Sequence, residues 1–165
     1  MIILKTPEEI EVMAKASKLV AETLQFLKPR VRPGVATDEL DRLAEEFIRT
    51  RGGKPAFKGY RSYPKTLCIS VNDQVVHGIP SKRTLKEGDI VGLDLGAIVE
   101  GFYGDAAMTV PVGTIDAKAA ELLRVTEAAL YAGIEQAVVG NRLSDISHAV
   151  QERAESAGFS IVTDF

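Results

Sequence analysis

The sequence predicts an α+β fold built from helix pairs and an antiparallel sheet. Apolar residues recur at helical spacing over 10–27 and again over 40–48. Two apolar segments, 89–99 and 102–110, then flank the dipeptide Glu100-Gly101, which is typical of a β-hairpin. The helical spacing returns after residue 115. These three observations set the fold class, and each element follows from local sequence signals.

The first helix is expected to begin at Thr6-Pro7. Thr6 is a capping residue, Pro7 suits the first helical position, and Glu9 completes a capping box. The helix is expected to end at Lys28-Pro29. Its apolar positions are Ile10, Met13, Ala14, Leu19, Val20, Leu24 and Leu27.

A turn at Val31-Arg-Pro-Gly34 leads to a second helix that begins at Thr37 or Asp38 and ends at Gly52-Gly53. A long aromatic loop, 54–65, follows it. Strands are then expected at 66–71, roughly 74–77, 89–99 and 102–110. The residues of the second helix that face inward are Leu40, Leu43, Ala44, Phe47 and Ile48.

Two aspartates, Asp94 and Asp105, lie in the hairpin although aspartate is depleted in strands. With Val99-Glu100 as the loop, Asp94 lies opposite Asp105. With Glu100-Gly101 as the loop, Asp94 lies opposite Ala107 and Asp105 is its diagonal neighbour. Both registers place the carboxylates on one face, about 5–8 Å apart. Like charges this close repel unless a proton or a cation lies between them, which favours a metal site. The alternative is a pair of solvated aspartates on an open sheet face.

The two faces of the hairpin differ in chemistry. The aspartates share their face with Gly96, Ala107 and Tyr103, and the two small residues leave room for an ion and a ligand. The opposite face is apolar and is expected to build the core. It carries Leu93, Leu95, Ala97, Val99, Phe102, Ala106, Met108 and Val110.

Composition excludes several classes of protein. The 165 residues are 45% hydrophobic and 26% charged, enough for one domain with a real core. The net charge of −3 gives no sign of the basic surface that a nucleic-acid-binding protein needs. The single cysteine excludes an internal disulfide or a zinc finger. No apolar run approaches the length of a membrane span, and the N-terminal sequence lacks a signal peptide. We therefore expect a cytoplasmic protein that binds neither nucleic acid nor membrane.

The helix-turn-helix order recurs in the last third of the chain. Helices are expected from Asp116 and from Ser144-Asp145 to Gly158, and a strand from Phe159 to Val162. We expect a single incomplete domain over 1–165, with a first helix-pair-plus-sheet unit at 1–110 and the start of a second at 111–165. The chain would then be the front part of a larger two-unit protein. Apolar stripes without a second sheet predict self-association.

Several short motifs along the chain are specific in combination. They are Lys5-Thr-Pro-Glu, Lys28-Pro29, Pro33-Gly34, Gly59-Tyr-Arg-Ser-Tyr-Pro-Lys65, Cys68-Ile-Ser-Val-Asn72, Val76-His-Gly-Ile-Pro80 and Gly88-Asp-Ile-Val91. Taken together they resemble type I methionine aminopeptidases of peptidase family M24, and the resemblance spans the whole chain. It implies the pita-bread (creatinase/aminopeptidase) fold, an antiparallel sheet with helices on one face, here the front half plus the first helices of the back half.

The resemblance implies a reaction and its metal ligands. The family removes the initiator methionine from nascent proteins and peptides with two divalent ions (Co, Mn, Fe or Zn). Asp94 would bind one ion and Asp105 would bridge both. The other ligands of the family, one histidine and two glutamates, and a second catalytic histidine come from its back half. After Asp105 this sequence has only His148, on a predicted helix without a matching motif, so the 165-residue chain alone is expected to be inactive.

The resemblance also implies residues that contact the substrate. His77 would hydrogen-bond the scissile amide and stabilise the tetrahedral intermediate. Cys68 with Phe57, Tyr60 and Tyr63 would line a pocket for the methionine side chain, whose sulfur packs well on aromatic edges. From the residues alone, His77 is an ordinary turn histidine at a strand end, Cys68 a small buried hydrophobe and the tyrosines loop anchors.

Three interpretations of function follow. The first is a metal-dependent methionine aminopeptidase, incomplete in this chain, that acts on the N-terminus of a peptide or nascent chain, with the ribosome as a further candidate partner. The second is a non-catalytic half-domain or fragment that pairs with itself or with a partner. The third is another pita-bread peptidase, such as an Xaa-Pro aminopeptidase.

Overall fold

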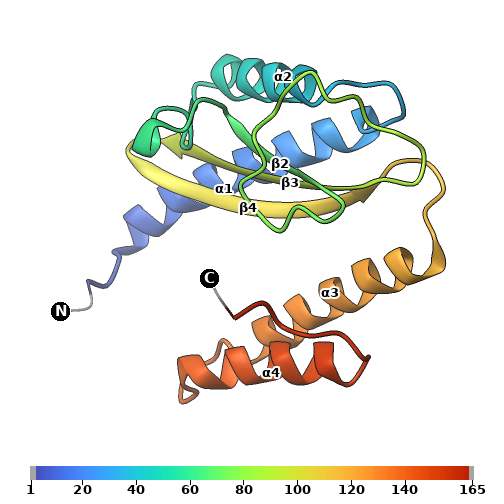
Figure 1. Ribbon diagram of the computed structural model, residues 1–165. Helices are drawn as coiled ribbons and strands as arrows, with labels where there is room; N and C mark the ends of the chain where they lie inside the picture. Colours follow the sequence, from blue (N-terminus) through green and yellow to red (C-terminus); the bar gives the residue numbers. More distant parts are fainter. Residues whose placement is uncertain (1–2, 164–165) are drawn as a thin grey trace. The chain divides into compact units, whose positions relative to one another are not determined.

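The computed structural model describes residues 3–163, and the chain divides into two compact units, residues 1–115 and 116–165. In the first unit, two long helices cover one face of an antiparallel sheet (Figure 1). The second unit is a helix pair. The α+β class with an antiparallel sheet is therefore confirmed.

Helix α1 (Pro7–Leu27) begins as the capping box predicts. The Thr6 hydroxyl accepts from the Glu9 N–H at 3.2 Å, and the Glu9 carboxylate accepts from the Thr6 N–H at 2.8 Å. A single 3₁₀ turn, Lys28–Arg30, follows. Helix α2 spans Thr37–Thr50, so Thr37 is its first residue.

The sheet is organised around β3 (Ile90–Val99), which pairs with β4 (Phe102–Pro111) along its whole length. The other edge of β3 pairs with β2 (Leu67–Val71) and then with the two-residue strand β1 (Lys54–Pro55). All pairings are antiparallel. Strand β1 was missed in the expected 54–65 loop, because two residues are too few for an alternating pattern to appear.

The strand expected at about 74–77 was wrong, and His77 therefore does not end a strand. After β2, Asn72 has a φ of 58° and the Gln74 side chain accepts from the Val71 N–H at 3.1 Å, which closes a turn. His77 has a φ of 59°, in the left-handed region that an extended strand cannot contain. The next residue, Gly78, accepts from the Ile69 N–H at 2.8 Å, so this loop follows the outer edge of β2.

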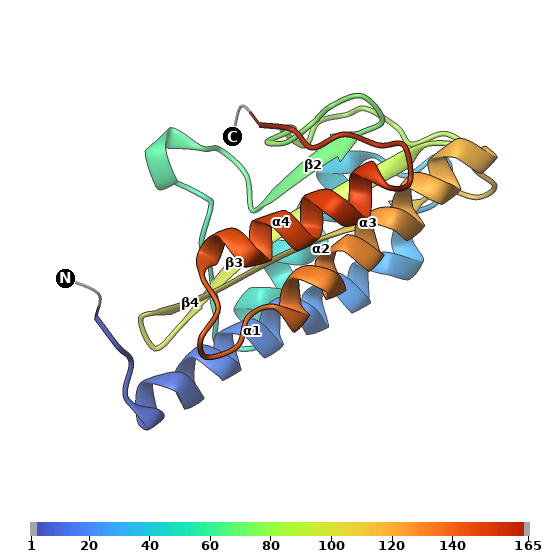
Figure 2. The same ribbon diagram turned by 90° about the horizontal axis from the view of Figure 1, so that it is seen from below.

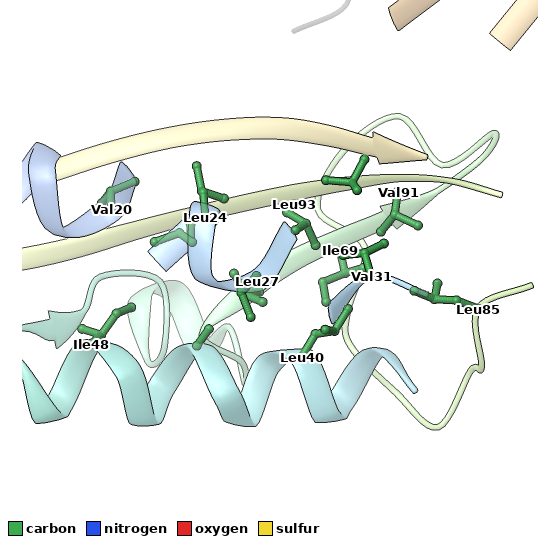
Figure 3. Packing of buried hydrophobic residues seen from close by; sticks show 14 of the residues in the cluster. Val20, Leu24, Leu27, Val31, Leu40, Ile48, Ile69, Leu85, Val91 and Leu93 are labelled. Carbon is green, nitrogen blue, oxygen red and sulfur yellow. The ribbon is translucent and has the colours of Figure 1, made fainter. Parts of the chain in front are cut away.

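The core lies between the helices and the apolar face of the hairpin (Figure 3). Leu93, Leu95 and Ala97 of β3 are fully buried there, as the alternation predicts. Burial of each leucine stabilises the fold by about 1.5–3 kcal/mol. Ala106 of β4 lies opposite Leu95 on this face, as expected, but is exposed. The helical residues of the cluster are Leu19, Val20, Leu24, Leu27, Leu40, Ala44 and Ile48.

The second unit consists of α3 (Ala117–Glu135) and α4 (Leu143–Glu155), which run side by side (Figure 2). Asp116 caps α3 by accepting from the Ala119 N–H at 2.8 Å, as predicted. The helices approach closely at Gly133, where a Cβ would lie 2.7 Å from Val150 Cγ2. The strand expected from Phe159 is absent from the described residues up to 163.

Candidate active site

The turn between β3 and β4 fixes the position of the two aspartates. Glu100 and Gly101 have φ values of 51° and 86°, which is the left-handed pair that a two-residue type I′ hairpin turn requires. The pairing is Asp94 with Ala107 and Gly96 with Asp105. Of the two registers weighed from the sequence, the Glu100-Gly101 register is found. The carboxylates are diagonal neighbours on one face, with about 7–8 Å expected between such positions.

The electrostatics of the pair favour a cation between them. Burial raises the pKa of Asp94 above its usual value, the charge of Asp105 raises it further, and His77 opposes the increase. Burial also raises the pKa of Asp105. Each carboxylate is therefore harder to ionise than a free aspartate, and a bound divalent cation would favour the ionised form of both.

Two of the predicted pocket residues lie on the same face as the aspartates. Cys68 pairs directly with Asp94 across β2 and β3, and only 5% of it is exposed. Burial raises the pKa of the Cys68 thiol, while a hydrogen bond from Tyr63 acts to lower it. Phe57 packs on Gly96, since a Cβ there would lie 2.9 Å from Phe57 Cε1. Gly96 itself pairs with Asp105, so Phe57 and Cys68 flank the two carboxylates.

The two tyrosines differ in their surroundings. The Tyr63 hydroxyl lies 2.8 Å from the Leu67 carbonyl oxygen and 3.2 Å from that of Gly78, so it joins β2 to the loop that carries His77. Burial raises the pKa of Tyr63. Tyr60 is 64% exposed, with the Arg61 guanidinium 5.4 Å from its ring centroid. The structure thus brings Tyr63 to the aspartate face and leaves Tyr60 largely in solvent.

His77 is exposed and follows the outer edge of β2. Its charge acts against the increase in the pKa of Asp94. The neighbouring Gly78 holds the loop in place, because its N–H donates to Ser70 Oγ at 3.2 Å and its carbonyl accepts from Ile69. A side chain on Gly78 would collide with the Ile69 carbonyl.

Two residues of α2 that the sequence did not single out support this site. Asp41 is 5% exposed and accepts from the N–H groups of Thr66 and Leu67, both at 2.8 Å. Glu45, one turn later, lies 2.7 Å from the Lys58 ammonium. The sequence does contain one signal for Asp41: it is an acidic residue next to Leu40 on the inward side of an amphipathic helix. An ionised group there needs partners, because burial of an unpaired charge is costly.

The donor chemistry fits a divalent metal in part. Asp94 and Asp105 offer hard carboxylate oxygens that bridge and neutralise such ions. Within residues 3–163, no group of three or more histidine, cysteine, aspartate or glutamate side chains converges on one point. The described residues therefore bring two candidate metal donors to one face of the hairpin. Separately, none of their helices has the length and hydrophobicity of a membrane span.

Comparison with known proteins identifies relatives over the full length of the chain. The model of metallopeptidase family M24 matches residues 11–165. The methionine aminopeptidase of Clostridium perfringens is 53% identical over 165 residues, which are 100% of this chain and 66% of that protein. The solved methionine aminopeptidases of Rickettsia prowazekii and Thermotoga maritima both superpose with a TM-score of 0.98, at 40% and 46% identity. They cover 100% of this chain, which corresponds to 66% and 67% of their own.

Proposed function

Because this chain belongs to metallopeptidase family M24, we propose that it supplies the methionine-recognising part and two metal ligands of a methionine aminopeptidase. The reaction would be hydrolysis of the peptide bond after an N-terminal methionine. The observation that carries the proposal is the placement of Asp94 and Asp105 on one face of the hairpin, flanked by Cys68 and Phe57. The pita-bread fold agrees with it.

Asp94 and Asp105 would hold the metal ions, with Asp94 on one ion and Asp105 bridging two. Cobalt, manganese, iron and zinc are the candidate ions. A bound pair of divalent ions supplies hydroxide at neutral pH and polarises the scissile carbonyl. Burial and the repulsion from Asp105 together raise the pKa of Asp94, which supports this role, because a proton or a cation relieves both effects.

His77 would act on the substrate rather than on the metal. Its imidazole is exposed, and its loop is bonded to the outer edge of β2, whose Cys68 pairs with Asp94, so an N–H would be available to a peptide bound over the aspartate face. A hydrogen bond from this group to the scissile amide would become stronger as negative charge develops in the tetrahedral intermediate. The attachment of Gly78 to β2 supports the role, since it fixes the backbone on one side of the histidine.

Phe57, Tyr63 and Cys68 would form the wall that contacts the methionine side chain. Thioether sulfur packs favourably at aromatic edges, and the buried thiol is a small polarisable neighbour. Tyr60 belongs to the same proposal but has the least support, because most of its side chain is in solvent. The natural substrates would be nascent chains in the cytoplasm, and the ribosome that delivers them is the proposed partner.

The proposal can be tested with a chimera of residues 1–165 and the remaining third of the Clostridium perfringens relative. We expect release of methionine from Met-Ala-Ser in the presence of Mn²⁺ or Co²⁺. Asp94→Asn and Asp105→Asn should abolish the release. Glu11→Gln is the matched control, since Glu11 is an exposed carboxylate of α1 that makes no ion pair within the described residues.

The chimera also discriminates the competing interpretations. A folded chimera that binds Mn²⁺ and cleaves no peptide would favour the non-catalytic interpretation. Release of the first residue from Xaa-Pro peptides, without methionine release from Met-Ala-Ser, would favour another peptidase of the same fold. Either result would overturn the proposal.

A further inference from the structure

We infer that Asp41 and Glu45 of α2 are positioning residues that hold the methionine pocket in its binding conformation. They act on residues 56–66, called here the pocket loop, and on the first residue of β2. The assignment of the ligand rests on the proposed function, but the mechanical role of the two carboxylates does not.

Asp41 fixes the end of the pocket loop. Its Oδ1 accepts from the N–H groups of Thr66 and Leu67, both at 2.8 Å, and Oδ2 lies 4.0 Å from the Lys65 ammonium. Asp41 and Thr66 are 5% and 0% exposed, so water does not compete for these bonds. A buried N–H group that is left without an acceptor destabilises the folded state. Because two such groups depend on Asp41, the start of β2 is fixed to α2.

Glu45 fixes the beginning of the same loop. Its carboxylate lies 2.7 Å from Lys58 Nζ and 2.9 Å from Arg49 Nη2. The Thr66 hydroxyl also reaches it, at 3.5 Å. The two carboxylates thus hold the pocket loop at positions 58 and 65–67, on either side of Tyr60–Tyr63.

The segment between these two attachments is strained, which is why it needs them. Arg61 and Ser62 have φ values of 47° and 65°, and Gly59 has 90°. A non-glycine residue in the left-handed region is strained and persists only where the surrounding structure holds it there. Within the loop, Gly59 N–H donates to the Tyr63 carbonyl at 2.8 Å, and the N–H groups of Tyr60 and Tyr63 donate to the carbonyls of Phe57 and Tyr60, both at 2.9 Å. The α2 carboxylates add constraints from outside the loop.

Tyr63 transmits this constraint to the site. Its hydroxyl contacts the carbonyls of Leu67 and Gly78, at 2.8 and 3.2 Å. Leu67 is the residue that Asp41 holds, and Gly78 follows His77. Release of the loop from α2 would therefore loosen Tyr63, uncover Cys68 and free His77 together, although α2 itself does not contact the substrate.

The first test uses the thiol of Cys68, which is the only cysteine of the 165-residue chain and is buried. Its alkylation rate by iodoacetamide under native conditions reports opening of the loop. We expect Glu45→Gln and Lys58→Met to raise the rate about threefold, since partly exposed ion pairs contribute modestly. Asp41→Leu should raise it by about tenfold or more, because two N–H groups lose their acceptor.

Two variants serve as matched controls in this test. Asp41→Asn keeps an acceptor oxygen for Thr66 and Leu67 and should restore the wild-type rate. Glu46→Gln changes the neighbouring residue, whose carboxylate pairs with Arg42 at 3.1 Å and not with the loop, and should leave the rate unchanged. Circular dichroism confirms that each variant is folded. If Asp41→Leu does not fold, Glu45→Gln and Lys58→Met decide the result, and an unchanged rate in both overturns the inference.

The second test uses the chimera described above and separates this inference from the proposed function. We expect Glu45→Gln to raise KM for Met-Ala-Ser about threefold with kcat retained, and to reduce the preference for methionine over alanine at the first position. Loss of kcat alone would overturn the pocket assignment. If the chimera is inactive, the proposed function fails, while a raised thiol rate still supports the role of Asp41 and Glu45.

Discussion

Phe57 occupies the space over Gly96: a Cβ on that glycine would lie 2.9 Å from Phe57 Cε1 and 2.9 Å from Ala56 Cβ. The Ala56 N–H also donates to the Gly96 carbonyl at 2.9 Å, so the start of the pocket loop lies directly on β3. Gly96 therefore admits the aromatic ring beside Asp105, its partner in β4. The absence of a side chain at this position serves the proposed pocket as well as the proposed metal site.

The first prediction is that Gly96→Ala displaces Phe57 and destabilises the protein by about 1–3 kcal/mol, as overpacking does. Thermal unfolding followed by circular dichroism measures the change. Gly92→Ala is the matched control on the same strand and face, because its Cβ would lie 3.6 Å from the nearest atom, at ordinary contact distance. Equal melting temperatures for the two variants would contradict the close packing of Phe57.

The second prediction concerns metal binding and pH. Titration calorimetry with Mn²⁺ should show weak binding to the 165-residue chain that is about tenfold weaker in Asp94→Asn or Asp105→Asn and unchanged in Glu11→Gln. Protons compete with the metal for the two carboxylates. Because the pKa values of Asp94 and Asp105 are raised, this competition extends to higher pH than for an ordinary aspartate. Affinity should therefore rise with pH through that range. Affinity that does not change with pH would place the ion elsewhere.

The third prediction is that the 165-residue chain alone does not release methionine, since two carboxylates do not fix an ion with an open position for water. Chromatographic detection of free methionine is the measurement, with the chimera as positive control. In the chimera, Asp105→Ala should lower kcat/KM more than His77→Ala, because it would remove the proposed bridging ligand rather than one hydrogen bond. The reverse order would exclude Asp105 as the bridge.

The fourth prediction is a pH dependence of stability at Asp41. Burial raises the pKa of its carboxyl in the folded state. The folded protein then binds a proton at Asp41 more tightly than the unfolded chain does. This carboxyl therefore adds most to the free energy of unfolding at low pH. That contribution is lost as pH rises from about 4 through the raised pKa. Urea unfolding of wild type and Asp41→Asn at several pH values should show the variant gaining relative stability over this window. A difference in the free energy of unfolding between the two proteins that does not change with pH would contradict the raised pKa of Asp41.

The fifth prediction concerns a stack of side chains that joins α1 to α2. The rings of Phe26 and Phe47 have centroids 4.5 Å apart, and Arg30 and Arg51 lie over them at 3.7 and 3.4 Å. A double-mutant cycle with Phe26→Leu and Phe47→Leu should give a coupling free energy of about 0.5–1.5 kcal/mol, measured by urea unfolding. Additive effects would show that the two rings contribute by burial alone.

Local rules explain what the sequence predicted. The cap at Thr6, the turn at Glu100-Gly101 and the shared face of Asp94 and Asp105 each depend on residues within about a dozen positions, so pattern and spacing suffice. Cys68 was placed correctly as a buried residue, although its pairing with Asp94 required the register of a distant strand.

The features that were missed depend on distant partners. Asp41 meets Thr66 and Leu67, which lie 25 and 26 residues away, and no local signal identifies such a pair. The loop at 74–77 has the residues of a strand, Val75 and Val76, but the turn at Asn72 and the contacts of Gly78 prevent an extended conformation. The self-association expected from the apolar stripes of the second unit stays a prediction.

The central position of β3 has a consequence for synthesis of the chain. Phe57, Cys68, Asp94 and Asp105 all lie on or beside this one strand, and the span from the first to the last is short. Because an emerging polypeptide is extended by about 5–20 residues per second, such a segment can fold within seconds of leaving the ribosome. Translation would thus assemble the proposed metal and pocket residues before the residues that follow them are made, and a pause downstream of Pro111 would leave this group already formed.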